Sequence, residues 1–329
     1  MTGGADEGVV RQLLAPLSLW LCREGVYEIV VNQPGEVLVE DATGWHSHHA
    51  PEMTFERLMR LARAIASYAH QGIDASRPLL SATLPGNERI QIVIPPATVS
   101  GTVSLTMRKP ASKSWTVEDM DQAGLFEGLT PTVGRSPRDA SLEVLHAAGH
   151  YRAFLETAVV ARKNIIISGA TGSGKTTLSK ALIQHIPRQE RIITIEDTPE
   201  LAIPHPNHVK LFYSKGGQGR AKISARDLLE ASLRMRPDRI LLQELRDGTA
   251  FYYLRNVNSG HPGSITTVHA NSPDLAFEQL TLLVKESEGG RDLERADIRS
   301  LLRMLVDIVV QCERVGSTFR VTGIDYRAC

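Results

Sequence analysis

A glycine-rich segment at residues 169–176 constrains the fold of this chain more than any other feature. Its sequence, GATGSGKT, follows the apolar run Ile165–Ser168 and precedes the amphipathic stretch Thr177–Ile183. The pattern G-x-x-x-x-G-K-[ST] in a strand–loop–helix setting is typical of a loop whose backbone N–H groups surround a phosphate. The helix adds its positive N-terminal end. The second half of the chain is therefore predicted to bind a nucleotide.

The residue types in this loop predict individual contacts. Lys175 reaches the β- and γ-phosphates as a point charge, and Thr176 offers its hydroxyl to Mg²⁺. The residues predicted to bind the nucleotide are Gly169, Ala170, Thr171, Gly172, Ser173, Gly174, Lys175, Thr176 and Thr177.

The region around this loop alternates amphipathic helices with short apolar strands. Three such strands are predicted at residues 164–168, 191–195 and 239–242. Strands that are apolar on both faces are typical of a parallel sheet covered by helices on both sides. Residues 142–329 are therefore predicted to form an α/β domain, the larger of two.

Residues 1–128 are predicted to form a smaller α+β domain. Strands are expected at 28–31, 37–40, 89–94 and 102–107, and Thr54 is a candidate N-cap for an amphipathic helix that ends near Gly72. Residues 129–141, rich in Pro, Gly and Ser, are predicted to be the linker. A short helix is expected at residues 13–20.

Acidic residues stand at two strand ends of the second domain. Glu196 and Asp197 close one strand, and Glu244 closes another. The carboxyl ends of parallel strands meet at one edge of the sheet, beside the phosphate loop, so these side chains are candidates to hold Mg²⁺ or position the attacking water. His261 and His269 lie in a third cluster, SGHPGSITTVHAN, which taken alone favours an ordinary core or surface histidine.

Together these segments resemble the secretion ATPase superfamily of type II secretion, type IV pili and type IV secretion. Four boxes occur in the family's order: GATGSGKT (169–176), ITIEDTPE (193–200), RMRPDRILLQELRD (234–247) and SGHPGSITTVHAN (259–271). The short chain without a paired CxxC element most resembles the type IV branch of VirB-type systems. The resemblance implies a RecA-like P-loop NTPase domain, ATP and Mg²⁺ as cofactors, and a homo-hexameric motor.

The resemblance also implies roles for residues outside the loop. Glu244 would orient or activate water, Glu196 and Asp197 would support the metal or the water, and His269 would sense the γ-phosphate. Arg89 and Arg108 are the positions that fit the N-domain arginines that reach over the nucleotide in this family. Arg246 stands at a candidate subunit boundary, without an assigned role. Gln243 replaces the family's usual Gly before the Walker B Glu.

Composition limits the alternatives. Lys+Arg and Asp+Glu each count 37, and aromatic residues are only 5%, which argues against a chain whose main task is to coat nucleic acid. A nucleic-acid-stimulated motor, a pilus or type II secretion ATPase, and a non-hydrolysing scaffold remain the rival hypotheses. Sequence-specific nucleic-acid binding is not expected.

The remaining features predict the setting. The three cysteines give no disulfide framework, and no apolar run is long enough to span a membrane. We expect a cytoplasmic protein, peripheral to the inner membrane, that contacts other type IV secretion components and a secreted protein or DNA. Solvated loops are expected at His46–His49 and at 215–222, and a core helical stripe at 301–309.

Overall fold

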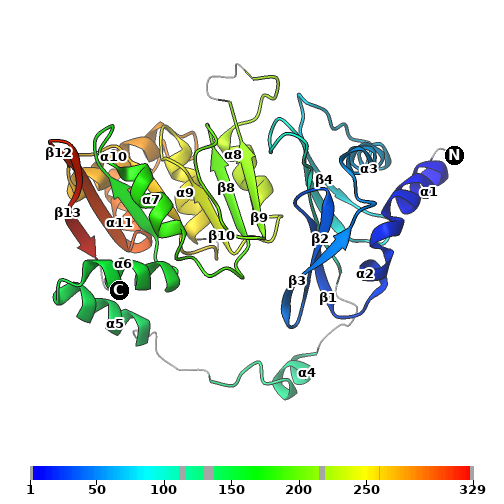
Figure 1. Cartoon of the computed structure of the whole chain (residues 1–329), viewed down its shortest axis with the longest axis horizontal. Helices are drawn as coiled ribbons and strands as arrows, with labels where there is room; N and C mark the ends of the chain where they lie inside the picture. Colours follow the sequence, from blue (N-terminus) through cyan, green and yellow to red (C-terminus); the bar gives the residue numbers. More distant parts are fainter. Residues whose placement is uncertain (1–2, 111–115, 129–136, 215–218, 259, 327–329) are drawn as a thin grey trace.

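A computed structural model describes residues 3–110, 116–128, 137–214, 219–258 and 260–326. Two folded parts stand side by side, with the N-terminal part next to the edge strand β9 (His208–Phe212) of the C-terminal sheet (Figure 1). Helix α4 (Val117–Gln122), between the two parts in sequence, lies below both of them in this view (Figure 1).

The N-terminal part contains a six-stranded antiparallel sheet in the order β3-β2-β1-β6-β5-β4. Its strands are β1 (Val26–Val31), β2 (Gly35–Asp41), β3 (Gly44–Ala50), β4 (Leu79–Thr83), β5 (Arg89–Val93) and β6 (Ser104–Arg108). The four strands predicted from sequence are confirmed, while β3 and β4 were missed. The prediction of a loop at His46–His49 is wrong, because these residues lie in β3 and pair with β2.

Helices cover one face of this sheet: α1 (Gly3–Leu14), a 3₁₀ turn (Ala15–Leu17), α2 (Ser18–Cys22) and α3 (Phe55–Tyr68). The predicted N-cap is confirmed, because Thr54 Oγ1 accepts a hydrogen bond from Arg57 N at 3.2 Å. Helix α3 ends at Tyr68, before the expected end at Gly72. Its apolar face packs into the core of the sheet through Leu58, Leu61 and Ile65.

The C-terminal part contains two sheets that meet edge to edge. Strands β10-β8-β9 form one and β11-β7-β12-β13 the other, and all pair in parallel except β12 with β13. A bridge between Glu244 and Thr267 connects them. The bounds are β7 (Ile165–Ser168), β8 (Ile192–Glu196), β10 (Arg239–Leu242), β11 (Ile265–Val268), β12 (Ile308–Val315) and β13 (Thr318–Tyr326).

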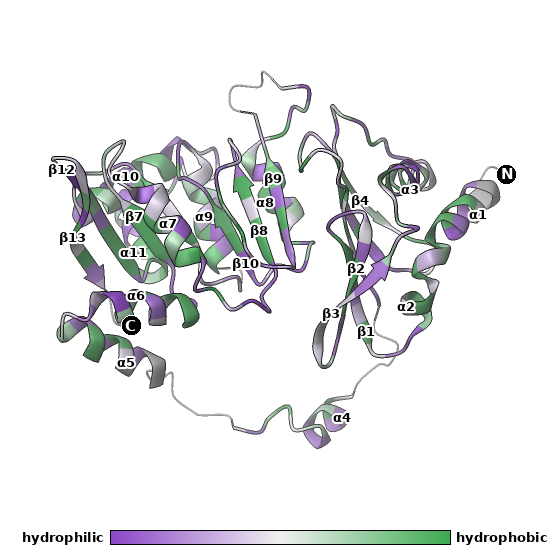
Figure 2. Cartoon of the chain, in the orientation of Figure 1, coloured by the Kyte–Doolittle hydropathy of each residue, from purple (hydrophilic) through white to green (hydrophobic). Residues whose placement is uncertain are grey.

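Helices cover both faces of this combined sheet, as the apolar strands predicted. Helices α8 to α11 share a core with alternate residues of the strands, and α6 and α7 share another core with the residues between them. Figure 2 shows hydrophobic strands in the middle of the sheet under helices of mixed colour. The helices are α5 (Pro137–Ala147), α6 (Tyr151–Val160), α7 (Lys175–Ile183), α8 (Ala225–Ser232), α9 (Thr249–Asn258), α10 (Pro273–Glu286) and α11 (Arg295–Leu305).

Two expectations for this part differ from the structure. Helix α5 begins at Pro137, inside the stretch 129–141 that was predicted to be linker, and residues 129–136 lie outside the described residues. The stripe at 301–309 is not one helix. Helix α11 ends at Leu305, and Ile308 and Val309 begin β12, where they are buried in the sheet.

Backbone pairing joins the two parts at β9. Thr98 and Leu211 form an antiparallel bridge, and Phe212 N donates to Ala97 O at 2.9 Å. Thr98 Oγ1 also donates to Lys210 O at 3.0 Å. The segment after β5 therefore acts as a short extra strand on the exposed edge of the C-terminal sheet.

A buried arginine strengthens this junction. Arg191, directly before β8, is fully buried, and its guanidinium donates to Asn32 Oδ1 (2.9 Å), Thr106 Oγ1 (3.2 Å) and Met235 O (2.8 Å). Asn32 and Thr106 belong to the N-terminal part and Met235 to the C-terminal part. Burial lowers the pKa of Arg191, and the several acceptors around it satisfy its donors.

We predict that Arg191→Ala lowers the free energy of unfolding by about 3 kcal/mol, because it leaves buried acceptors in both parts without a donor. Urea denaturation monitored by circular dichroism measures this change. Arg152→Ala is the matched control. Arg152 is exposed and, within the described part of the chain, pairs only with Glu156 one helical turn away, so its loss should change stability by less than about 0.5 kcal/mol. Equal effects of the two substitutions would contradict the prediction.

Candidate nucleotide site

The phosphate loop lies between β7 and α7, as predicted. Gly172 and Gly174 have φ values of 74° and 88°, in the left-handed region that favours glycine. At Gly169 the neighbouring strand comes so close that an added Cβ would lie 2.3 Å from Cys312 O. Glycine is therefore required at the two positions for different reasons. At 169 the backbone lies too close to β12 for a side chain, and at 174 the backbone is left-handed where it enters α7.

Lys175 begins α7 and points back into its own loop. Its Nζ donates to Gly169 O at 2.8 Å and to Ala170 O at 2.9 Å, and only 7% of the residue is exposed. Burial lowers the pKa of Lys175, while the nearby Glu244 carboxylate acts in the opposite direction. The positive charge of the ammonium group thus lies at the centre of the loop, where a bound phosphate would neutralise it.

His269 connects Lys175 to the acidic strand end. Its Nδ1 lies 3.4 Å from Lys175 Nζ, and its Nε2 lies 2.8 Å from Glu244 Oε1. His269 follows β11 and Glu244 follows β10, so two strand ends place a histidine and a carboxylate next to the loop. The histidine box that was weak as a sequence pattern therefore lies in the same site as the phosphate loop.

The backbone near Gln243 explains how Glu244 reaches this position. Gln243 N donates to Ile195 O at 3.1 Å, as part of the β8 side, whereas Leu245 N donates to Thr267 O at 2.9 Å, on the β11 side. The chain thus changes its pairing partner from one sheet to the other at Glu244. Gln243 instead of Gly is accommodated here, and its backbone forms the regular hydrogen bond.

Arg246 contacts two of the three acidic candidates, Asp197 and Glu244. Its Nη1 donates to Asp197 Oδ2 at 3.0 Å, and its Nη2 contacts Glu244 Oε2. The hydrogen bond to Glu244 raises the pKa of Arg246. Burial, helped by the charge of Asp197, raises the pKa of nearby Tyr213 to about 12. Sequence reasoning left Arg246 without a role, and the only available signal was its position two residues after Glu244.

Glu196 does not face this cluster, in contrast to the expectation that it supports a metal ion or water. The residue has no exposed surface, and its Oε1 accepts from Thr194 Oγ1 at 2.6 Å. Its Oε2 accepts from the backbone N–H groups of Glu200 and Leu201, both at 2.8 Å. Both carboxylate oxygens are thus engaged in holding the loop after β8. Neighbouring residues of a strand point to opposite faces, so only Asp197 reaches the loop edge.

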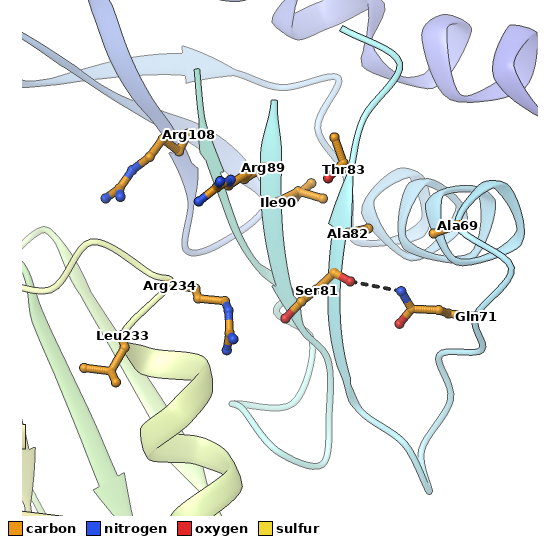
Figure 3. Close-up of a pocket in the computed structure, with 10 residues that line it drawn as sticks. All are labelled: Ala69, Gln71, Ser81, Ala82, Thr83, Arg89, Ile90, Arg108, Leu233 and Arg234. Atoms are coloured by element: carbon orange, nitrogen blue, oxygen red, sulfur yellow. Dashed lines mark hydrogen bonds between the residues drawn. The ribbon is translucent and has the colours of Figure 1, made fainter. Parts of the chain in front are cut away.

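Arg89 and Arg108 lie away from the phosphate loop. They line a cavity of about 710 Å³ with Arg234, which follows α8, and Figure 3 shows the three side chains around it. Arg89 and Arg108 are directly opposite each other on β5 and β6. Arg108 Nε donates to Glu28 Oε1 at 2.5 Å, while Arg89 has no ion pair with the described residues. Strands β9, β8, β10 and β11 separate this cavity from β7.

The loop fits a triphosphate and its magnesium ion. Ser173 Oγ is buried without a hydrogen-bond partner, and the Thr176 side chain stands in the first turn of α7, so hydroxyl groups are available beside the Lys175 ammonium. Within the described residues no group of three or more His, Cys, Asp and Glu side chains could hold a metal ion. A magnesium ion here would take most of its ligands from phosphate oxygens and water, with only one or two from the protein, as is usual for nucleotide-bound magnesium.

Cys312 gives a test of burial at this site. Burial raises the pKa of its thiol to about 11, with Lys175 acting in the opposite direction. The raised pKa lowers the thiolate fraction of Cys312 at pH 8, and burial keeps the reagent away, so Cys312 should react with N-ethylmaleimide at least about 100-fold more slowly than the exposed Cys22. Mass spectrometry of peptides after timed labelling measures both rates. Equal native rates would contradict the prediction, and equal rates in 6 M guanidinium serve as the control.

Comparisons with known proteins place this chain in a family. The sequence matches the family of type II/IV secretion system proteins over residues 14–320. It is 55% identical to the type IV secretion system protein VirB11 of Bartonella henselae, over 97% of this chain and 93% of the relative, and 47% identical to that of Brucella suis, over 93% and 87%. The crystal structure of the VirB11 ATPase from the Brucella suis type IV secretion system, in complex with sulphate, superposes with a TM-score of 0.94 at 44% identity, over 98% of this chain and 96% of that chain.

Proposed function

This chain belongs to the type II/IV secretion system protein family, and from this membership and the site geometry we propose how its residues act on ATP. It is an ATP-hydrolysing motor of a type IV secretion system. The observation that carries the assignment of roles is the continuous contact from Lys175 through His269 to Glu244.

The phosphate loop is proposed to bind the triphosphate through the backbone N–H groups of residues 169–177. Lys175 exchanges its contacts with the loop carbonyls for the β- and γ-phosphates, and its desolvated charge stabilises the transferring group. Thr176 and Asp197 are the proposed protein donors for Mg²⁺. When bound, the ion would offset part of the negative charge of the triphosphate.

Glu244 is the proposed residue that orients the attacking water. Arg246 contacts its Oε2. The Oε1 of Glu244 lies 2.8 Å from His269 Nε2 but has no hydrogen-bond partner among the described residues, so this oxygen can accept a proton from water. His269 lies between Glu244 and Lys175, where it would contact the γ-phosphate and respond to its loss. Glu196 has a structural role in this proposal, since it holds the loop that carries Asp197 in place.

Arg89 and Arg108 are proposed to act on the nucleotide of a neighbouring subunit in a homo-hexameric ring. Two arginines directly opposite on neighbouring strands repel each other, and a bound phosphate would relieve that repulsion. Their own phosphate loop lies several strands away, so a nucleotide that reaches them belongs to another copy. In this arrangement each ring contact completes an ATP site.

The proposed setting is the cytoplasmic face of the inner membrane, where the ring meets other components of the secretion machine and a secreted protein or DNA. No described helix combines the length and the hydropathy needed to cross a bilayer. The motor is proposed to move its N-terminal part against its C-terminal part, a motion that requires the contacts of Thr98 and Arg191 between the two parts to change.

We predict that Lys175→Ala and Glu244→Gln each reduce ATP turnover by at least about 100-fold, because each removes charge stabilisation or water positioning from the transition state. A phosphate-release assay measures turnover, and sedimentation with ATP measures assembly. Glu244→Gln should still bind ATP and form the hexamer. Turnover that persists in either variant would overturn the site assignment, and secretion that persists in cells carrying Glu244→Gln would favour a scaffold.

We predict that mixing Arg89→Ala with Lys175→Ala subunits before assembly restores activity. If Arg89 acts on a neighbour, a ring contact that joins an intact phosphate loop to an intact Arg89 is complete, and random mixing gives about one quarter of such contacts. Each variant alone should be inactive. Absence of recovery in mixed rings of confirmed hexameric size would show that Arg89 acts within its own subunit or not on the nucleotide.

A further inference from the structure

The hairpin of β12 and β13 holds an exposed aromatic ring against the phosphate loop. Phe319 is 56% exposed, yet its ring lies so close to Gly174 that an added Cβ would be 2.9 Å from Phe319 Cγ. Phe319 is directly opposite Arg314 and on the same face as Cys312, whose carbonyl approaches Gly169. One face of the hairpin therefore borders the loop at both of its ends.

The strand order determines which part of a nucleotide would meet this hairpin. Glu244 and His269 lie on the β10 and β11 side of β7, whereas β12 and β13 lie on the opposite side (Figure 1). A triphosphate on Lys175 with its γ-phosphate toward Glu244 extends its other end away from β11. The ribose and base then leave the loop on the side of Phe319.

We propose that Phe319 provides the stacking surface for the nucleotide base, an inference that rests on the proposed ATP site. A flat apolar ring, held in place by loop backbone and open to solvent on its other side, matches the face of a purine. Stacking recognises a base by its π-face, so the contact separates a nucleotide from inorganic triphosphate. It does not by itself separate adenine from guanine.

The exposure of Phe319 is consistent with this role. Val315 and Val321 on the same hairpin are also exposed, but neither is aromatic. Among the described residues of the hairpin, Phe319 is the aromatic residue next to Gly174. Gly174 is the N-cap of α7, and its φ of 88° already disfavours other residues. The ring of Phe319 beside it leaves no space for a side chain at this position either.

The test compares binding of ATP with binding of inorganic tripolyphosphate, both with Mg²⁺, by isothermal titration calorimetry. Phe319→Ala should weaken ATP binding about tenfold, the usual loss of one base–aromatic contact, and change tripolyphosphate binding by less than about twofold. Val321→Ala is the matched control, since Val321 is 45% exposed on the same strand, and it should change neither affinity. Lys175→Ala should weaken both ligands.

A second measurement uses Phe319→Trp. Its indole should keep ATP affinity near the wild-type value, and ATP should quench its fluorescence whereas tripolyphosphate should not. Equal weakening of both ligands by Phe319→Ala would mean that the ring only supports the loop and would overturn the proposal. Unchanged ATP affinity with altered hexamer assembly would overturn it too, because Phe319 would then pack on a neighbour. Lys175→Ala that binds both ligands normally would instead refute the proposed nucleotide site.

Discussion

The change of hydrogen-bonding partner at Glu244 is the interaction on which the rest of the site depends. The bond from Leu245 N to Thr267 O joins the β10 side and the β7 side of the C-terminal part, and Thr267 Oγ1 adds a second bond to Gln243 O at 3.1 Å. With it, the ends of β8, β10 and β11 meet beside the phosphate loop. Asp197, Glu244 and His269 come from three different strands, and this junction brings the ends of those strands together near Lys175.

The sequence allowed the C-terminal fold to be predicted because its signals are local. Fewer than ten consecutive residues are enough to recognise each of these features: the phosphate loop, the apolar strands and the acidic strand ends. The parallel sheet follows from them. Strand β3 was missed because its sequence GWHSHHA has neither apolar alternation nor β-branched residues, and it is held by pairing with β2. The helix–strand change at residues 305–308 was missed because apolar residues continue across it.

The positions of the site residues depend on information that short segments of sequence do not contain. Glu196 and Asp197 are neighbours in sequence, so composition makes them equivalent, but the strand turns one toward Thr194 and the other toward Arg246. Arg89 and Arg108 were placed near the nucleotide by resemblance, and their own chain holds them beside Arg234. Whether a side chain contacts the nucleotide of its own subunit or that of a neighbour depends on how the two parts of the chain are placed relative to each other. The residue types in a short segment carry no information about that placement.

Strand β8 has a mechanical consequence. Its first neighbour is Arg191, anchored in the N-terminal part by Asn32 and Thr106, and its last neighbour is Asp197, anchored to Arg246. A five-residue strand is about 17 Å long and does not stretch appreciably, so it behaves as a rigid rod between the two anchors. Work done on one end of this rod appears at the other, and by linkage the coupling has the same strength in both directions. A force that displaces the N-terminal part would thus also displace Asp197 at the acidic edge of the site. Phosphate binding that displaces Asp197 would in turn displace the N-terminal part.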